Sequence, residues 1–412
     1  MCCWKRAGGR KKAATVRGSP EGVTGMKEEE AEFQSESLIP GLPEDIALVC
    51  LARVPVTSLW GVCREWQLML SKSSEFKFAR QQQGKSELNW LYTLVHRSDG
   101  RYEWNAFDPL MEKWHPLPNM PESVDFQLTT PGSIGLSHSI QCVSTKSKLV
   151  MLAGLKPSTS KAGQNWSQLE PALNEPWIFN PNSCVWTKGT AIQSPRKWCV
   201  CGVVNERVYV ASGCGQQWDM SLSKRSEVYD LDSDSWTLLP NLESSKFSGE
   251  AITAVNVEGK LHMVSGRGVF VKEGAIFCPV TSKWSKMPPG LRKGWIGSCV
   301  SINDRFYMID EDLGKLSVYN KATDSWTTVL EDTKMKNLTN IVASDGKIFG
   351  VVKSEDSNAE TDGSTLRVVD LTTSPPSIYT QRVPHGRVVS LQILARMNGK
   401  RGRGSDCAFD HM

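Results

Sequence analysis

The stretch Val228-Tyr229-Asp230-Leu231-Asp232-Ser233-Asp234-Ser235-Trp236 decides the fold of this chain. It places an aromatic residue seven positions before a tryptophan, with a polar turn between them. The spacing recurs at Phe107 and Trp114, Phe179 and Trp186, Phe277 and Trp284, and Tyr319 and Trp326. Successive tryptophans of the series lie 42 to 72 residues apart. A fixed internal spacing repeated at an outer period near 50 indicates a repeat architecture.

Each aromatic segment is accompanied by an earlier stretch that is typical of a β-strand. These stretches alternate apolar and polar residues or are β-branched and apolar. They are Lys148–Gly154, Arg207–Gly213, Lys260–Gly266, Arg305–Asp310 and Lys347–Val352. Tight turns precede most of them, including Glu258-Gly259 and Asn303-Asp304.

Counting strands gives four for each of five units, at 134–190, 198–240, 250–289, 296–331 and 339–383. The first unit, 88–118, has only three predicted strands. A spare strand, Arg387–Ala395, lies near the C-terminus. Placed beside the three strands of the first unit, it completes a four-stranded sheet. Six four-stranded sheets joined in this way form a closed propeller with few exposed edges.

The repeats resemble the kelch repeat in their aromatic–Asp/Asn…Trp segments. Kelch strands end in a Gly-Gly pair, whereas these end in Ala153-Gly154, Ser212-Gly213 and Ser265-Gly266. Units five and six lack the glycine, and unit six has Thr373–Ser377 in place of the tryptophan segment. The resemblance implies an all-β, six-bladed kelch-type β-propeller at 88–396.

A different composition occupies residues 37–80. Glu44 and Asp45 follow Pro43, as in the first turn of a helix, and Pro55 ends that helix. The segment has more apolar side chains than so few residues can bury among themselves. We therefore predict a small α-helical domain that packs on a partner, either the propeller of the same chain or another protein.

The pattern of this helical segment resembles the F-box, and an F-box before kelch repeats resembles the plant F-box/kelch-repeat family of Skp-interacting proteins. The resemblance implies a substrate-recognition subunit of an SCF-type (Skp–cullin–F-box) ubiquitin ligase. The F-box then binds a Skp-type adaptor, and through it cullin and a RING protein, while the propeller binds an unknown protein substrate. The implied adaptor-binding residues are Leu42, Pro43, Ile46, Leu51, Val54, Pro55, Leu59, Val62, Cys63 and Trp66.

Loops on one face of a propeller are candidates for binding the substrate. The loops between second and third strands, and those between blades, lie on one face and are the longer ones here. They carry a recurrent basic and aromatic composition that suits an acidic or phosphorylated peptide, although exposed loops are often basic in any protein. The candidates are Arg196, Lys197, Trp198, Lys246, Phe247, Arg292, Lys293, Trp295, Lys336 and Arg387.

No catalytic motif stands out in the sequence. There is no G-x-S-x-G, H-E-x-x-H, Walker or dinucleotide fingerprint, and the histidines of the repeat region are scattered. We therefore expect a non-catalytic protein without cofactor or metal. Two alternatives stay open: a kelch scaffold in a non-ubiquitin assembly, and a propeller oxidase with a metal site.

Net charge and cysteine spacing limit the classes of partner and the cellular compartment that we expect. A net charge of +4 favours neither a nucleic-acid nor a membrane partner, and Arg53 and Pro55 interrupt the longest apolar stretch. Twelve cysteines without C-x-x-C spacing fit a reducing compartment, and the N-terminus does not resemble a secretory signal. We expect a protein of the cytoplasm, the nucleus or both. We also expect disordered tails at 1–36 and 397–412 and a linker at 81–87.

Overall fold

The structure of the chain is a computed structural model. It describes residues 37–54, 59, 62–66, 69, 73–83, 89–99, 101–109, 112–120, 140–152, 172, 174–181, 183–215, 219–243, 252–265, 273–353, 363–384 and 386–395. The predicted tails therefore lie outside the described residues. The same is true of Pro55, Lys246 and Phe247.

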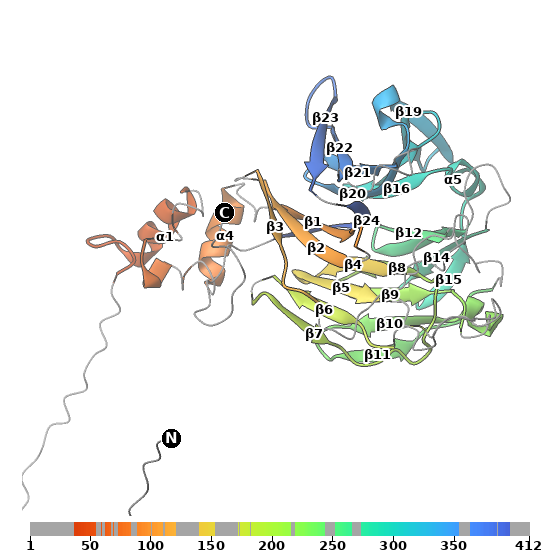
Figure 1. Cartoon of the computed structure of the whole chain (residues 1–412), viewed down its shortest axis with the longest axis horizontal. Coiled ribbons are helices and arrows are strands. Elements are labelled where there is room, and N and C mark those ends of the chain that lie inside the picture. Colours follow the sequence, from red (N-terminus) through yellow and green to blue (C-terminus); the bar gives the residue numbers. More distant parts are fainter. Residues whose placement is uncertain are drawn as a thin grey trace, which may run out of the picture.

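The N-terminal part is helical, as predicted, and Figure 1 shows it beside the ring of strands rather than inside it. Helix α1 spans Glu44–Ala52 and helix α4 spans Ser74–Gln82. Among the described residues of this helical domain, the buried core contains Leu51, Ala52, Leu59, Met69 and Phe76. The two helices are also tied by Arg80, whose Nη1 donates to the carbonyl oxygens of Ala52 (3.3 Å) and Val54 (2.9 Å).

The rest of the described chain forms six four-stranded antiparallel sheets, the blades of a propeller (Figure 1). Blade 1 consists of β24 (Arg387–Ala395), β1 (Asn89–His96), β2 (Tyr102–Asp108) and β3 (Lys113–Pro116). Blade 2 consists of β4 (Gln141–Thr145), β5 (Lys148–Leu152), β6 (Trp177–Asn180) and β7 (Val185–Lys188). Blade 3 consists of β8 (Val200–Val204), β9 (Arg207–Ala211), β10 (Ser226–Asp230) and β11 (Ser235–Leu238).

The second half of the ring follows the same plan. Blade 4 consists of β12 (Ile252–Val257), β13 (Lys260–Ser265), β14 (Glu273–Cys278) and β15 (Lys283–Lys286). Blade 5 consists of β16 (Ser298–Ile302), β17 (Arg305–Asp310), β18 (Lys315–Asn320) and β19 (Ser325–Glu331). Blade 6 consists of β20 (Leu338–Ser344), β21 (Lys347–Val352), β22 (Ser364–Asp370) and β23 (Ser377–Val383).

The last strand closes the ring. Strand β24 pairs with β1 from Ala395 opposite Asn89 to Arg387 opposite His96, which confirms the predicted role of the spare strand. The inner strands β24, β4, β8, β12, β16 and β20 contact one another in this order, and β20 contacts β24 again. Closure covers the sheet edges that the inner strands would otherwise expose.

Two-residue turns join the first and second strands of blades 2 to 6. Both residues of each turn have positive φ, the geometry of a hairpin turn whose twist matches its strands. The turns are Lys146-Ser147, Asn205-Glu206, Glu258-Gly259, Asn303-Asp304 and Asp345-Gly346. We call the side of the ring on which they lie the tight-turn face, and the opposite side the long-loop face.

The aromatic–tryptophan spacing has a structural meaning that is the same in five blades. The two residues lie directly opposite each other on the outer two strands, as Tyr229 and Trp236 do with ring centroids 4.8 Å apart. In blades 2 to 5 the indole then donates to a carbonyl in the connection that leads in from the preceding blade, and in blade 1 Trp114 donates to Arg382 in β23 of blade 6. Trp236 Nε1 bonds to Thr190 and Trp284 Nε1 to Pro240, both at 2.8 Å. The motif therefore joins neighbouring blades, as expected for core residues between them.

Blade 6 forms without the tryptophan. Ile378 lies opposite Val369, in the register that the tryptophan and its aromatic partner have elsewhere. A longer turn separates the two residues, and Ile378 packs with Leu371 against the buried Val369. An apolar cross-strand pair is sufficient here because the blade is held by pairing along all four strands.

Candidate functional site

Helix α1 has two apolar faces. Its inner face, with Ala47 and Leu51 four residues apart, is buried in the helical core. On its outer face Ile46 and Val49, three residues apart, are 47% and 39% exposed. A helix in a self-sufficient domain has a polar outer face, so this one has apolar surface left for a partner.

Other apolar side chains of the helical domain are exposed as well. Val62 is 57% exposed, and Phe78 on α4 is 62% exposed. Pro43 is exposed and Leu42 is half-buried at the start of α1. We refer to Pro43, Ile46, Val49, Val62 and Phe78 as the exposed apolar set.

The structure divides the predicted adaptor-binding residues into two groups. Leu51 and Leu59 are buried, and Val54 and Trp66 pack against the same core, with Trp66 Nε1 donating to the carbonyl oxygen of Leu38 at 2.6 Å. These residues shape the helical domain. The others that the structure describes reach the surface in full or in part: Leu42, Pro43, Ile46, Val62 and Cys63.

The sequence-based site list left out Val49 and Phe78. Val49 could have been found from its position three residues after Ile46, which places both on one side of a helix. Phe78 had no such signal, because its exposure depends on how α4 packs against α1.

On the long-loop face, Arg196 is a correction to the predicted substrate ring. Its side chain is fully buried in an ion pair with Glu227, whose side chain is also fully buried. Arg196 Nε donates to the carbonyl oxygen of Ser194 and Nη1 to that of Arg225, both at 2.9 Å. The other Glu227 carboxylate oxygen accepts a hydrogen bond from the backbone N–H of Gln193 at 3.1 Å. A buried ion pair with its hydrogen bonds satisfied is a structural feature, so Arg196 is not available to a partner.

Lys197 and Trp295 are further corrections of the same kind. Lys197 is 1% exposed, and its backbone forms a β-bridge with Cys214. Trp295 is 2% exposed and packs with Phe306, ring centroids 5.8 Å apart. Both lie in connections that cross from one blade to the next, and those connections continue the packing between blades instead of standing out from it.

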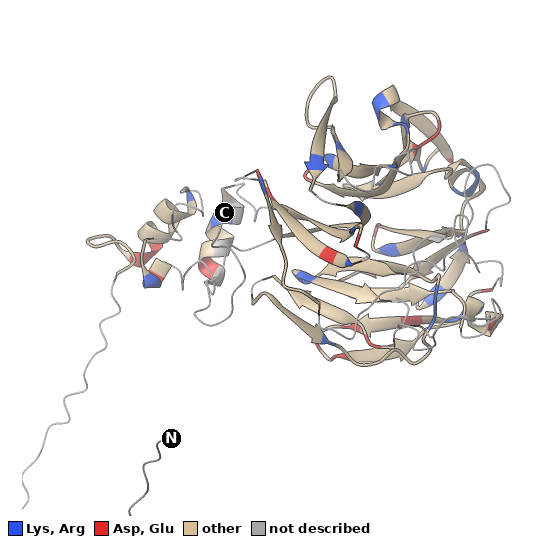
Figure 2. Ribbon diagram, viewed as in Figure 1, with Lys and Arg blue, Asp and Glu red and all other residues tan. Residues whose placement is uncertain are grey.

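The other described candidates reach the surface. Lys293 lies in helix α5 (Pro289–Gly294), Lys336 follows the 3₁₀ turn η4 (Thr333–Met335), and Arg387 begins β24; all three are exposed. Arg292 and Trp198 are half-buried. Figure 2 shows basic residues interspersed with acidic ones over the blades, so the surviving candidates are separate positions and not one continuous ring.

Arg292 also lines a cavity of 210 Å³ together with Glu243, Glu273, Trp284 and Lys286. This cavity offers both charges around an indole ring.

The described residues have neither a metal-ligand cluster nor a membrane-spanning helix. Among them, no group of three or more His, Cys, Asp or Glu side chains is placed to hold a metal ion. Within the same residues, no helix has both the length and the apolar character needed to cross a membrane. The features that stand out are two surfaces: the exposed apolar set and the long-loop face.

Similarity to known proteins agrees with the division of the chain into a helical domain and a propeller. No family model matches the chain. The chain is 31% identical over 386 residues to "F-box/kelch-repeat protein SKIP25" of Arabidopsis thaliana, covering 89% of this chain and 91% of the relative. It is 28% identical to "F-box protein AFR" (70% and 73% covered) and 25% identical to "F-box/kelch-repeat protein SKIP30" (73% and 78% covered), both of the same plant. The chain belongs to the F-box/kelch-repeat family.

Proposed function

We propose that this chain is the substrate-recognition subunit of an SCF-type ubiquitin ligase. The helical domain binds a Skp-type adaptor, and the propeller binds the protein to be ubiquitinated. The observation that carries the proposal is the outer face of α1, where Ile46 and Val49 are exposed although the inner face already fills a core. Family membership supports the same assignment.

The exposed apolar set is suited to a protein partner. Burying a Val or Ile side chain contributes about 1.5–3 kcal/mol when it leaves water completely. Ile46 and Val49 together therefore supply a useful part of a stable interface, and Pro43 and Val62 extend it. The buried residues Leu51 and Leu59 contribute indirectly, because they hold α1 in place.

The attachment of the two parts supports the long-loop face as the substrate side. Asn89 begins the first propeller strand, and its Nδ2 donates to Ser344 and Asp345 at the β20–β21 turn, at 2.7 and 2.9 Å. The helical domain is therefore joined to the propeller at the tight-turn face. The long-loop face is left free for a substrate, with Arg292, Lys293 and Lys336 offered to an acidic or phosphorylated segment.

In this function the chain does no covalent chemistry. It holds its substrate beside a ubiquitin-charged enzyme, and the linkage raises the effective concentration of the reacting groups. The place of action that we propose is the cytoplasm, the nucleus or both.

The adaptor interface is tested by the double variant Ile46→Asp with Val49→Asp in the full-length chain. We expect the Kd for a purified Skp-type adaptor to rise at least about a hundredfold, since two charges enter an apolar contact. The matched control is Val280→Asp, because Val280 is an apolar side chain that is 90% exposed on blade 4. Adaptor binding that is equal in the double variant and the control contradicts the proposal.

The substrate side is tested by charge reversal at Arg292, Lys336 and Arg387 in the complex with adaptor. We expect the variant complex to capture less substrate than the unaltered complex, while its binding to the adaptor persists. Lys283→Glu at the opposite end of blade 4 serves as the control. Undiminished substrate capture by the triple variant excludes these basic residues as its contact.

A further inference from the structure

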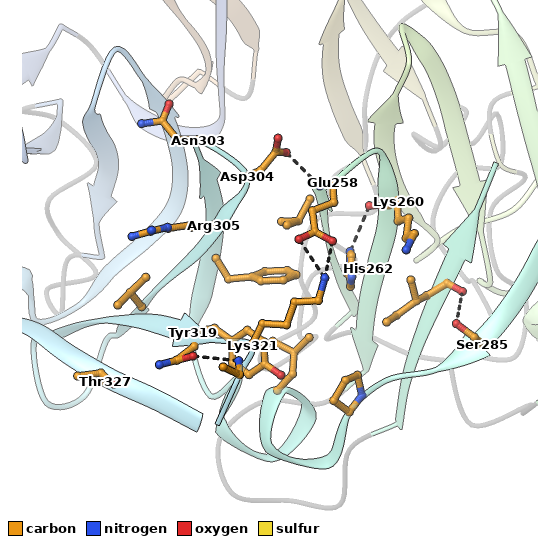
Figure 3. Close-up of a pocket in the computed structure, with 18 of the residues that line it drawn as sticks. Glu258, Lys260, His262, Ser285, Asn303, Asp304, Arg305, Tyr319, Lys321 and Thr327 are labelled. Carbon is orange, nitrogen blue, oxygen red and sulfur yellow. Dashed lines mark hydrogen bonds and ion pairs between the residues drawn. The ribbon is translucent and has the colours of Figure 1, made fainter. Parts of the chain in front are cut away.

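A cavity of 750 Å³ lies between blades 4 and 5, outside both surfaces described above (Figure 3). Its walls come from strands β13 and β14 of blade 4 and β17 and β18 of blade 5. Ile276, Phe306 and Val318 give the walls an apolar character, and His262 is the histidine that lines it. Pockets that bind small molecules have this size and composition.

The repeat explains why the cavity occurs at this interface. The third residue of each second strand pairs with the residue before the motif aromatic and faces the next blade. In blades 2, 3, 5 and 6 that residue is Val150, Tyr209, Tyr307 and Phe349. In blade 4 it is His262. Tyr209 fills its interface by packing on Phe277 of blade 4, ring centroids 5.6 Å apart, whereas His262 meets Phe306 of blade 5 with a smaller ring than the tyrosine or phenylalanine of blades 3, 5 and 6.

His262 is held as a neutral ring. Its Nδ1 lies 3.1 Å from the carbonyl oxygen of Lys260, so the Nδ1–H donates there and Nε2 is left as an acceptor. The residue is 7% exposed, and its ring packs edge-to-face with Phe306, with the two ring centroids 4.9 Å apart. Burial lowers its pKa to about 4, so the ring carries no charge near neutral pH.

The charged groups that face the cavity include one lysine without an ion-pair partner among the described residues. Lys321 binds both carboxylate oxygens of Glu258, at 2.7 and 3.0 Å, and this pair bridges the two blades at the rim. Asp304 accepts the backbone N–H of Glu258 at 3.0 Å. Lys260 also lines the cavity, and it forms no ion pair with any described residue. Figure 3 places Lys260 with His262 on the blade 4 wall, whereas the Arg305 side chain points away from the cavity.

We propose that this cavity binds a small organic anion, whose apolar body packs against Phe306 and Ile276 and whose acidic group is held by Lys260. The proposal goes beyond the ligase function and does not depend on it, since it uses neither the helical domain nor the long-loop face. His262 favours such a ligand because its ring is uncharged and smaller than the tyrosine or phenylalanine at this position in blades 3, 5 and 6.

The test uses 4-iodobenzoate as the probe, because it is an apolar ring with one negative charge and its iodine can be located by anomalous scattering. Calorimetric titration of the full-length chain measures the affinity, and a soaked crystal places the iodine. We expect binding between blades 4 and 5. We expect Lys260→Ala to weaken it about tenfold, as loss of one charged contact does, and His262→Tyr to abolish it by filling the space.

Lys148→Ala is the matched control, because Lys148 begins the second strand of blade 2 as Lys260 begins that of blade 4. It should bind the probe as the unaltered chain does. Lys260→Ala stays informative even if His262→Tyr proves unstable. Three results overturn the proposal: no binding, an iodine site elsewhere, or equal affinity for the neutral analogue 4-iodobenzyl alcohol.

Discussion

The helical domain and the propeller differ in which side chains they expose and which they bury. In the helical domain, apolar side chains such as Ile46 and Phe78 are left exposed beside a core that is already formed. In the propeller, charged and aromatic side chains such as Arg196 and Trp295, which lie in loops, are buried. The helical domain exposes apolar side chains on one helix face, whereas the connections between the blades bury a charged and an aromatic side chain.

The contrast indicates which region depends on a partner. A propeller closed by β24 satisfies its own strand edges, and the connections between its blades contribute to the interior. The helical domain has only a small core, so the outer face of α1 stays in water until another surface covers it. We infer that the propeller is stable alone and that the helical domain gains stability on binding.

The largest effect on stability is expected for Arg196→Ala. The change leaves the Glu227 carboxylate buried without its partner and removes the donors to the carbonyls of Ser194 and Arg225. Breaking one half of a buried pair costs about 3–5 kcal/mol. Chemical denaturation of the full-length chain measures the loss in the free energy of unfolding.

Two further variants test the reason for this loss. The double variant Arg196→Leu with Glu227→Leu should recover most of the stability, because it leaves no unpaired buried charge. Lys293→Ala, an exposed basic residue, should change the free energy of unfolding by less than about 0.5 kcal/mol. If Arg196→Ala were as mild as Lys293→Ala, the buried pair would not be what holds this part of blade 3.

The strands and their closure followed from the sequence because both depend on local pattern. Strands β17, β21 and β24 begin and end where alternation and turn residues predicted. The aromatic–Trp spacing encodes a cross-strand pair, so it fixes the register of the outer strands. Even the degenerate blade 6 was counted correctly, since its turn and strand signals persist without the tryptophan.

The burial of loop residues could not be predicted in the same way. Arg196 looked like an exposed anchor because its partner Glu227 lies 31 residues further along, in another strand. The same holds for Trp295, whose partner Phe306 belongs to the next blade. Periodicity reports which side of a strand a residue occupies, but it does not report what a loop meets after the chain has turned.

A smaller effect is expected from acid, through His262. Its pKa in the folded chain is about 4, below the ordinary value of 6.5, because burial disfavours the charged ring. As the pH falls, His262 of the unfolded chain therefore takes up a proton at a higher pH than His262 of the folded chain does. The contribution of His262 is complete above about pH 6.5 and is lost as the pH falls toward 4; by pH 5 the loss is about 2 kcal/mol.

Denaturation at pH 7 and pH 5 measures this loss, with His262→Phe as the comparison. The variant should lose about 2 kcal/mol less than the unaltered chain between the two pH values, because it has no imidazole to protonate. Since carboxylates elsewhere also titrate, only the difference between the two proteins reports on His262. An equal loss in both would place the acid sensitivity outside the interface of blades 4 and 5.

The smallest effect is expected for Ile46→Ala, and it separates the two faces of one helix. Ile46 is 47% exposed and Leu51 is 2% exposed, and both are aliphatic residues of α1. Leu51→Ala should destabilise the helical domain by about 2–5 kcal/mol, because it opens the core, whereas Ile46→Ala should cost less than about 0.5 kcal/mol. Hydrogen exchange of the α1 amides measures both. With adaptor bound, protection of α1 should rise, and Ile46→Ala should reduce that rise although it leaves the free chain unaffected. If Ile46→Ala loosened α1 in the free chain as much as Leu51→Ala does, the outer face would belong to the fold of this domain and not to a partner.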